Sequence, residues 1–358
     1  MNGLATITAL SREFGTPDYV LGGGGNTSVK TAETLWIKPS GTQLNEMTPE
    51  RFVAIDRKRL AALYAYPPAA DAAVRENDVK ELMLAARVDP NGGRPSVETP
   101  LHDMLEAKFV VHTHPAWVNG LTCGMTGEAA ARRLFPDALW VPYIDPGFTL
   151  SMDVKARVAN YRKQHGAHPA VILLENHGIF VAGDSAEAIR GHYAAVMTAL
   201  RAEYHRSGVS LELKYRSPTI EHEVKDVSAI LADLFEGDTL AVAASAPFAT
   251  ADGPLTPDHM VYAKAFPYRG ALTREGFAAY RSERGYLPRI IDTPEGVFAV
   301  RNTVTAAELS LALARDGGLV RQLAAAFGGV RYLDDAARRF IESWEVESYR
   351  EQQAIARG

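Results

Sequence analysis

The chain has 358 residues, of which 47% are hydrophobic and 23% charged, which is an ordinary globular composition with the length of about two domains. Its net charge of -5 argues against a nucleic-acid-binding protein, because such proteins usually carry a basic face. The single cysteine, the lack of a secretory signal at the start and the lack of a long apolar run predict a soluble, cytoplasmic protein that does not enter a membrane.

The N-terminal part of the chain mixes strand-like and helix-like segments, which favours a layered α/β domain over a helical bundle. The expected strands are rich in Val, Ile, Phe and Trp and lie at Leu35–Ile37, Phe52–Ile55, Phe109–His112, Leu139–Tyr143, Ala170–Leu174 and Ile179–Ala182. The expected helices are residues 79–86, 100–107, 152–164 and 185–206, the last with Asp184 or Ser185 as its N-cap.

Gly, Ser and Pro collect at residues 207–220, where a break between two domains is expected. The boundary is set near residue 215, between a first domain of residues 1–215 and a smaller α+β domain of residues 216–358. This prediction carries an uncertainty of about 10 residues, because boundaries are the weakest inference from a single sequence.

The second domain is expected to combine a small sheet with helices. Its strand-like segments are Leu240–Ala244 and a hairpin formed by Arg289–Asp292 and Val297–Val300 around the sequence TPEG. Thr305 and Glu308 are expected to form a capping box, and Gly317–Gly318 to interrupt the helix that follows. A last helix is expected from about Asp334 to Ala354.

The strongest chemical signal is the sequence VVHTHP. His112 and His114 are two residues apart at the end of an expected strand, so both imidazoles project from the same face and suit two ligands of one metal ion. The pair alone is a weak signal, since this spacing arises more often by accident than at a site. The apolar strand before it and the abrupt stop at Pro115 favour a functional position.

The sequence LLENHGIF supplies a third histidine. His177 lies in a polar turn between two apolar strands, where it would complete a set of three ligands and leave a position open for a substrate. Taken alone, the same residues suit an ordinary hairpin turn equally well.

Glu98 follows a Gly-Gly-Arg-Pro loop and precedes a helix-like segment. A carboxylate close to three imidazoles can bind the metal at rest and then move a proton. The alternative is an acidic residue that interacts favourably with a helix N-terminus. His102, one turn further along, is expected to be packed in the interior or to cap the helix rather than to bind the metal.

The four glycines at 22–25 do not fit the dinucleotide-binding pattern or the P-loop pattern. They can turn backbone amides inward as an anion-binding nest, to which Asn26 adds a donor. Ser40 and Gly41 form a second loop of small donors after a strand, so the two loops together could hold a phosphate or a carboxylate. Each loop taken alone is more often an ordinary turn.

The order of these motifs resembles the class II aldolase/adducin family. The motifs are GGNTS at 24–28, KPSGT at 38–42, PSVETPLH at 95–102, HTHP at 112–115 and NHG at 176–178. The resemblance covers about residues 5–205, and five ordered motifs are far more specific than any one of them.

The resemblance implies a three-layer α/β/α fold and a metal-dependent aldolase of carbohydrate metabolism that cleaves a ketose or ketose phosphate through an enediolate. Zn2+, with Mn2+, Fe2+ or Co2+ as alternatives, would be bound by His112, His114 and His177, and Glu98 would be the general acid/base. The phosphate cradle would consist of Asn26, Ser40, Gly41 and Ser96. The family's second serine is replaced by Val97, which removes one phosphate hydrogen bond.

The family also implies a homotetramer with sites between subunits, often with a tyrosine from the neighbouring subunit that assists proton transfer, and Tyr143 is the expected residue. Segments 254–262 and 340–350 resemble the aldolase half of bifunctional rhamnulose-1-phosphate aldolase/dehydrogenase proteins. In the first of these segments, Asp258 and His259 are expected to be structural rather than to reach a substrate.

Three alternatives remain open from the sequence. The same scaffold supports epimerases, dehydratases and decarboxylases, although epimerases usually have Asp in place of Glu98. The second alternative is a non-enzymatic interaction module of the adducin kind, but adducin-like domains lack the three histidines. The third is a sugar-binding or regulatory protein whose function lies in the C-terminal unit.

Overall fold

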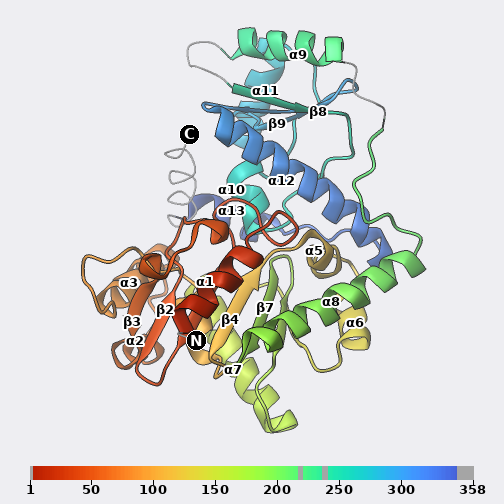
Figure 1. Ribbon diagram of the computed structural model, residues 1–358. Coiled ribbons are helices and arrows are strands. Elements are labelled where there is room, and N and C mark those ends of the chain that lie inside the picture. The colour runs from red at the N-terminus through yellow and green to blue at the C-terminus, as the bar shows by residue number, and fades with distance from the viewer. Residues whose placement is uncertain (1–2, 217–220, 236–240, 345–358) are drawn as a thin grey trace. The chain divides into compact units, whose positions relative to one another are not determined.

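The computed structural model describes residues 3–216, 221–235 and 241–344 and divides into two compact units (Figure 1). The first unit consists of residues 1–118 and 126–202, and the second of residues 119–125 and 203–358. Each unit contains its own sheet, so each is described separately.

The first unit contains a mixed sheet with the strand order β3-β2-β1-β4-β7-β6-β5. Its strands are β1 Asn26–Lys30, β2 Thr34–Ile37, β3 Val53–Asp56, β4 Phe109–Thr113, β5 Leu139–Val141, β6 Val171–Leu174 and β7 Gly178–Gly183. Neighbouring strands are antiparallel except β5 and β6, which are parallel. Strands that are distant in the sequence therefore meet at the centre of the sheet, where β4 lies between β1 and β7.

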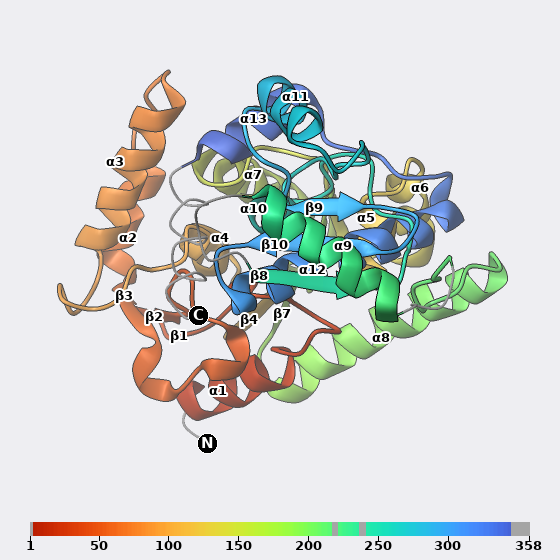
Figure 2. The same ribbon diagram turned by 90° about the horizontal axis from the view of Figure 1, so that it is seen from above.

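Helices cover both faces of this sheet. One face is covered by α1 Gly3–Glu13 and α8 Ala186–Arg206, and the other by α2 Arg57–Tyr64, α3 Ala72–Ala85, α4 Thr99–Met104 and α7 Phe148–His165. Figure 2 shows α1 on one side of the sheet and α4 and α7 on the other. The shorter elements are α5 Ala116–Thr122, α6 Gly127–Leu134 and the 3-10 turns Leu44–Glu46 and Pro49–Arg51. The predicted three-layer α/β/α domain is confirmed.

Alternation along β4 decides which way its histidine points. Val110 packs with Leu101 and Val154 in the core under α4 and α7, whereas the hydroxyl of Thr113 bonds the hydroxyl of Tyr193 on α8 at 2.7 Å. Because successive side chains of a strand point to opposite faces, His112 shares the face of Val110. The start of α4 carries Glu98 on this same face.

The strand β1 was not predicted, because its sequence NTSVK reads as the end of a glycine loop. All five residues are buried, and the two faces bury polar groups. Thr27 bonds Ser11 of α1 at 2.6 Å, and Ser28 bonds His102 of α4 at 2.7 Å. Hydrophobic alternation cannot reveal a strand whose buried side chains are satisfied by hydrogen bonds instead of apolar contacts.

The predicted helices are present, with α3 and α7 beginning earlier than expected and α4 ending earlier. Ser185 is the residue that caps α8, because its hydroxyl oxygen accepts a hydrogen bond from the backbone N–H of Ala188 at 3.1 Å. Helices α1, α2, α5 and α6 were not predicted.

The second unit has a three-stranded antiparallel sheet with the order β8-β10-β9. Its strands are β8 Ala241–Ser245, β9 Ile290–Asp292 and β10 Val297–Arg301, and its helices are α9 Glu221–Leu234, α10 Pro257–Ala263, α11 Arg274–Arg284, α12 Val304–Leu323 and α13 Asp335–Ser343, with a 3-10 turn at Ala324–Phe327. Val227 of α9 and Phe277 of α11 pack against Phe298 on one face, while α12 contacts β8 and β10. The predicted hairpin and the smaller α+β unit are confirmed.

Two predictions for this unit are wrong. The N-cap of α12 is Thr303, whose hydroxyl accepts from the N–H of Ala306 at 3.2 Å, and not Thr305. The helix also continues through Gly317 and Gly318. A side chain at Gly318 would lie 2.9 Å from the carbonyl oxygen of Ala249, so this glycine permits close packing rather than a break.

The last predicted helix begins as expected, with the carboxylate of Asp334 accepting from the N–H of Ala337 at 2.8 Å. The helix ends at Ser343, where Trp344 is an extended C-cap, so a single helix to Ala354 is not formed, and the residues beyond Trp344 lie outside the described part of the chain. Among the helices that the structure describes, none is both long enough and apolar enough to cross a membrane.

Candidate metal centre

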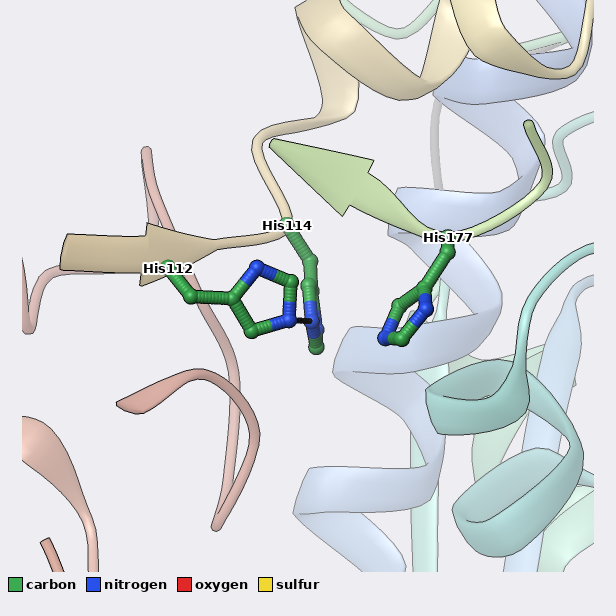
Figure 3. A group of neighbouring side chains, drawn as sticks. All are labelled: His112, His114 and His177. Carbon is green, nitrogen blue, oxygen red and sulfur yellow. Dashed lines mark hydrogen bonds between the residues drawn. The ribbon is translucent and has the colours of Figure 1, made fainter. Parts of the chain in front are cut away.

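Three histidines from two adjacent strands of the first unit meet at one point. His112 is in β4, His114 follows the end of β4, and His177 precedes β7, which pairs with β4. One ligand nitrogen from each imidazole lies within 4.8 Å of those of the other two, and the three rings face one another (Figure 3). The two sequence motifs, which are more than sixty residues apart, therefore form one cluster because β4 and β7 are neighbours.

The spacing of the imidazoles suits ligands of a single ion. The Nε2 atoms of His112 and His114 are 2.9 Å apart. Two nitrogen ligands that each lie about 2.0–2.1 Å from one metal ion are separated by roughly 2.9 Å at a right angle and roughly 3.3 Å at the tetrahedral angle. The two nitrogens therefore lie close to the separation that two ligands of one ion have.

The ring of His112 is held from two sides. Its Nδ1 faces the carbonyl oxygen of Ile179 at 2.9 Å, and its plane stacks on Phe180 with the ring centroids 3.9 Å apart. A carbonyl oxygen can only accept, so Nδ1 carries the hydrogen and Nε2 carries the lone pair that a metal needs.

The turn between β6 and β7 positions His177. Asn176 adopts the left-handed conformation with a φ of 52°, which asparagine tolerates better than most residues. At Gly178, a Cβ atom would lie 2.5 Å from the carbonyl oxygen of Thr113 and 2.7 Å from Cδ2 of His114. Only glycine therefore lets the turn approach His114 this closely.

The carboxylate of Glu98 faces the histidines. Its Oε1 lies 3.4 Å from Nε2 of His112 and 3.5 Å from Nε2 of His177. This oxygen is buried and accepts no hydrogen bond from the described part of the chain. Glu98 is the N-cap residue of α4, but its side chain makes no capping hydrogen bond to that helix.

The other oxygen of Glu98 is anchored. Its Oε2 accepts a hydrogen bond of 2.5 Å from the side-chain amide of Asn26, which also donates to the hydroxyl of Ser96 at 3.0 Å. His102 contacts the carbonyl oxygen of the same amide through its Nε2. Burial lowers the pKa of His102 well below its ordinary value, so this ring is neutral and part of the interior, as expected.

The loop that contains Ser40 and Gly41 contacts both the segment before Glu98 and the glycine loop. The backbone N–H of Ser40 donates to the carbonyl oxygen of Arg94 at 2.8 Å, and Pro39 forms a bridge with Pro95. The buried ammonium group of Lys38 donates to the carbonyl oxygens of Gly23 at 3.3 Å and Thr42 at 2.6 Å. The predicted cradle residues Asn26, Ser40, Gly41 and Ser96 thus belong to segments tied together by hydrogen bonds. The sequence analysis did not identify Lys38 as a residue that joins these segments.

Two other sequence-predicted residues have hydrogen-bond partners outside the histidine cluster. Tyr143 follows β5, which pairs with β6 at the edge of the sheet, and its hydroxyl donates to Asp145 at 3.2 Å. His259 belongs to the second unit, where it bonds Thr256 at 2.7 Å and Asp316 at 3.0 Å. These contacts tie α10 to α12, as expected of a structural histidine.

The donor set fits a divalent metal ion. Three imidazoles converge, one has its tautomer fixed for binding, and a buried carboxylate oxygen without a hydrogen-bond partner among the described residues faces them. Imidazole ligands suit Zn2+, Fe, Co and Ni, and a carboxylate adds affinity for Mn2+, so the donors do not select one metal.

Comparison with known proteins gives relatives of different lengths. An uncharacterized oxidoreductase of Bacillus subtilis, YuxG, is 25% identical over 388 residues, which cover 92% of this chain and 55% of the relative. The chain thus spans about half the length of that relative. The methylthioribulose-1-phosphate dehydratase of Xenopus tropicalis is 26% identical over 190 residues, covering 51% of this chain and 74% of the relative.

Solved structures resemble the first part of the chain. The N-terminal class II aldolase domain of a Thermoplasma acidophilum protein is 29% identical, with a TM-score of 0.48, over 55% of this chain and 91% of that chain. The L-fuculose-1-phosphate aldolase of Thermus thermophilus is 18% identical, with a TM-score of 0.37, over 56% of this chain and 96% of that chain. The family model described as Class II Aldolase and Adducin N-terminal domain matches residues 5–204, more than half of the chain. The chain therefore belongs to the class II aldolase and adducin family, as the order of its motifs predicts.

Proposed function

We propose that this protein is a metal-dependent aldolase, a lyase that cleaves or forms a carbon–carbon bond in a ketose or a ketose phosphate. One observation carries the proposal. Oε1 of Glu98 is buried without a hydrogen-bond partner in the described chain and faces three convergent imidazoles. Leaving a carboxylate oxygen in this state is unfavourable unless a cation or a substrate proton completes its surroundings.

His112, His114 and His177 are the residues that would hold the metal, with Zn2+ as the first candidate and Mn2+, Fe2+ or Co2+ as alternatives. Class II aldolases use divalent metal ions. When bound, such an ion supplies Lewis acidity, which polarises the carbonyl and hydroxyl oxygens of a ketose and stabilises the negative charge that develops when the bond breaks.

Glu98 is the proposed general acid/base, which moves a proton at the carbon atom of the reacting bond. Its position inside the first unit, with a side chain 10% exposed, keeps bulk water from this proton. Tyr143 of a neighbouring subunit is the proposed proton donor and acceptor at the aldehyde oxygen, and within its own chain Asp145 accepts a hydrogen bond from its hydroxyl. This role for Tyr143 rests on the family resemblance.

The proposed substrate class follows from the loop of Ser40 and Gly41 and from the segment that contains Ser96. Ser40, Gly41 and Ser96 offer small donors in segments that are tied to each other, a local pattern that suits a phosphate or a carboxylate. Since Val97 replaces a serine of the family pattern, an unphosphorylated ketose is retained beside a ketose phosphate as a candidate.

The proposal also concerns the two parts of the chain, the oligomeric state and the location in the cell. Residues 1–215 are assigned the catalysis. Residues 216–358 are assigned no role, although two of their segments resemble the aldolase half of the bifunctional proteins, and the relative from Bacillus subtilis is named an oxidoreductase. A homotetramer and a cytoplasmic location stay predictions from the sequence.

A dehydratase is the second candidate function, because the chain resembles methylthioribulose-1-phosphate dehydratases. Removal of water from a ketose phosphate needs the same metal ligands and the same proton transfer by Glu98. The two activities differ in their products, since a dehydratase retains every carbon atom in one molecule.

The test uses the full chain loaded with Zn2+ or Co2+. L-Fuculose 1-phosphate, L-rhamnulose 1-phosphate and the two unphosphorylated ketoses are supplied, and the release of an aldehyde is followed with and without a chelator. Aldehyde release that stops on chelation supports the aldolase. Loss of water without carbon–carbon cleavage favours the dehydratase, and a loaded protein that transforms no member of the panel contradicts the proposed substrate class.

A further inference from the structure

The side-chain amide of Asn26 uses both of its hydrogens within the protein. Its Nδ2 donates to Oε2 of Glu98 at 2.5 Å and to the hydroxyl oxygen of Ser96 at 3.0 Å. A primary amide has two N–H donors. The amide therefore has no further N–H to offer a substrate while these two bonds are in place.

The orientation of this amide is fixed by its surroundings. The reverse orientation would place the amide oxygen against the carboxylate of Glu98, with two acceptors in contact and no hydrogen between them. Asn26 is only 4% exposed, so water does not substitute for either partner.

His102 in turn has a fixed tautomer. Burial keeps the ring neutral by lowering its pKa, so it carries one N–H. That hydrogen is on Nε2, because the amide oxygen of Asn26 can only accept, and Nδ1 then accepts from the hydroxyl of Ser28 at 2.7 Å. Donors therefore run in one direction, from Ser28 to His102, to Asn26 and to Glu98.

The strand pairing places this series of hydrogen bonds beside the histidines. Asn26 in β1 is the direct register partner of His112 in β4. With Oε2 held by Asn26, the carboxylate of Glu98 can only direct Oε1 toward His112 and His177, from which it is 3.4 and 3.5 Å away.

We propose that Asn26, oriented by His102 and Ser28, is a positioning residue that fixes the carboxylate of Glu98 against the three histidines and is not a ligand of the substrate phosphate. The inference rests on the proposed function, because it assigns Glu98 to the site. It replaces the cradle role that the family resemblance implies for Asn26.

A cradle role would require the amide to leave its partners. Turning one N–H toward a substrate phosphate would break the bond to Glu98 or the bond to Ser96. If the bond to Glu98 broke, the carboxylate would hold a second buried oxygen without this donor. A phosphate dianion beside this carboxylate would add repulsion between like charges. The cradle is therefore left to the hydroxyl groups of Ser40 and Ser96 and to the backbone at Gly41.

The test compares Asn26→Ala with Ser40→Ala in the full chain. Co2+ affinity is measured by competition with a chelating dye, the visible spectrum of bound Co2+ is recorded, and binding of inorganic phosphate to the metal-free protein is measured by calorimetry. Asn26→Ala is expected to lower the Co2+ affinity by about 10–100-fold and to change the spectrum, since an outer-shell partner is lost. Its affinity for phosphate should equal that of the parent, whereas Ser40→Ala should lower phosphate affinity and leave Co2+ binding unchanged.

The inference is overturned if Asn26→Ala binds Co2+ with the parent affinity, or if it weakens phosphate binding as Ser40→Ala does. Ser28→Ala, which removes only the first donor of the series, is a milder second variant should Asn26→Ala fail to fold. It should shift Co2+ affinity in the same direction by a smaller factor.

A readout without metal separates this inference from the proposed function. In the metal-free protein, the melting temperatures of Asn26→Ala, Glu98→Gln and the double variant form a cycle. If Asn26 positions Glu98, the loss in the double variant is smaller than the sum of the single losses. Additive losses overturn the inference even where the parent cleaves ketose phosphates, and an inactive parent with a non-additive cycle indicates that only the proposed function has failed.

Discussion

The carbonyl oxygen of Ile179 accepts a hydrogen bond of 2.9 Å from Nδ1 of His112. This contact joins β7 to a side chain of β4 and leaves the lone pair of His112 on Nε2, the atom nearest His114 and Glu98. The pairing of these two strands therefore fixes both the orientation and the tautomer of the ring, as the proposed metal site requires.

Replacement of Glu98 by Gln should remove the proton-transfer group while keeping its shape. We expect kcat/KM for ketose phosphate cleavage to fall by about 10²–10⁴-fold, the usual contribution of a positioned acid/base. The matched control is Glu106→Gln, because Glu106 is 59% exposed and pairs with Arg162 at the surface. Retention of the parent rate in Glu98→Gln would remove Glu98 from the mechanism.

Gly178→Ala should weaken the site through geometry alone. The added Cβ would lie 2.5 Å from the carbonyl oxygen of Thr113 and 2.7 Å from the ring of His114, so β4 and the turn must separate. We expect a loss of roughly 1–3 kcal/mol in the free energy of unfolding and weaker metal binding. Calorimetric melting and metal titration measure the two effects.

The control for that variant is Gly191→Ala on α8, where an added Cβ meets no atom within 4 Å. Here alanine should stabilise the helix by about 0.5–1 kcal/mol, because it loses less backbone entropy than glycine. Equal losses in the two variants would contradict the steric account of Gly178.

Lys30 should make stability depend on pH in the alkaline range. Burial, assisted by the charge of Arg57, lowers the pKa of this ammonium group to about 7 from 10.5 in the unfolded chain. Between these pH values the unfolded chain binds a proton that the folded protein does not. The free energy of unfolding therefore rises with pH by up to about 1.4 kcal/mol per pH unit, and this gain is lost as the pH falls through about 7.

Lys30→Met should abolish this dependence, although the carbonyl oxygen of Ala107 loses its donor. Urea unfolding near pH 7.5 and near pH 9.5 provides the measurement. The parent and an exposed control, Lys155→Met, should gain stability between the two pH values, and Lys30→Met should not. A parallel gain in Lys30→Met would show that the ammonium group remains charged in the folded protein.

The sequence predicts the site better than it predicts the strand that supports the site. The histidine motifs and Glu98 can be recognised in the sequence because each follows an apolar strand or precedes a helix. The order of the motifs then predicts that these residues lie close together in the fold. β1 is missed because Asn26, Ser28 and Lys30 bury polar groups, so no apolar alternation marks the strand. The partners that satisfy these groups are about seventy residues away in the sequence.

The roles of Asn26 and of the glycines in α12 could not be read from the sequence for a similar reason. The glycine loop suggests an anion-binding nest that includes Asn26. Only the folded structure, in which Asn26 is the register partner of His112, shows that the amide of Asn26 donates a hydrogen bond to Glu98. Gly317 and Gly318 suggest a helix break by their intrinsic propensity. Close packing of Gly317 against Leu255 and His259 and of Gly318 against Phe248 and Ala249, which depends on tertiary structure, explains them instead.

Metal content tests the central claim most directly. Elemental analysis would compare the parent chain with the His112→Ala/His114→Ala variant and with His165→Ala, which changes an exposed histidine that stacks on Tyr161. The account predicts about one equivalent of a divalent transition metal in the parent and in His165→Ala, and none in the double variant. Parent protein that holds no metal even after reconstitution, or a double variant that retains a full equivalent, would contradict it.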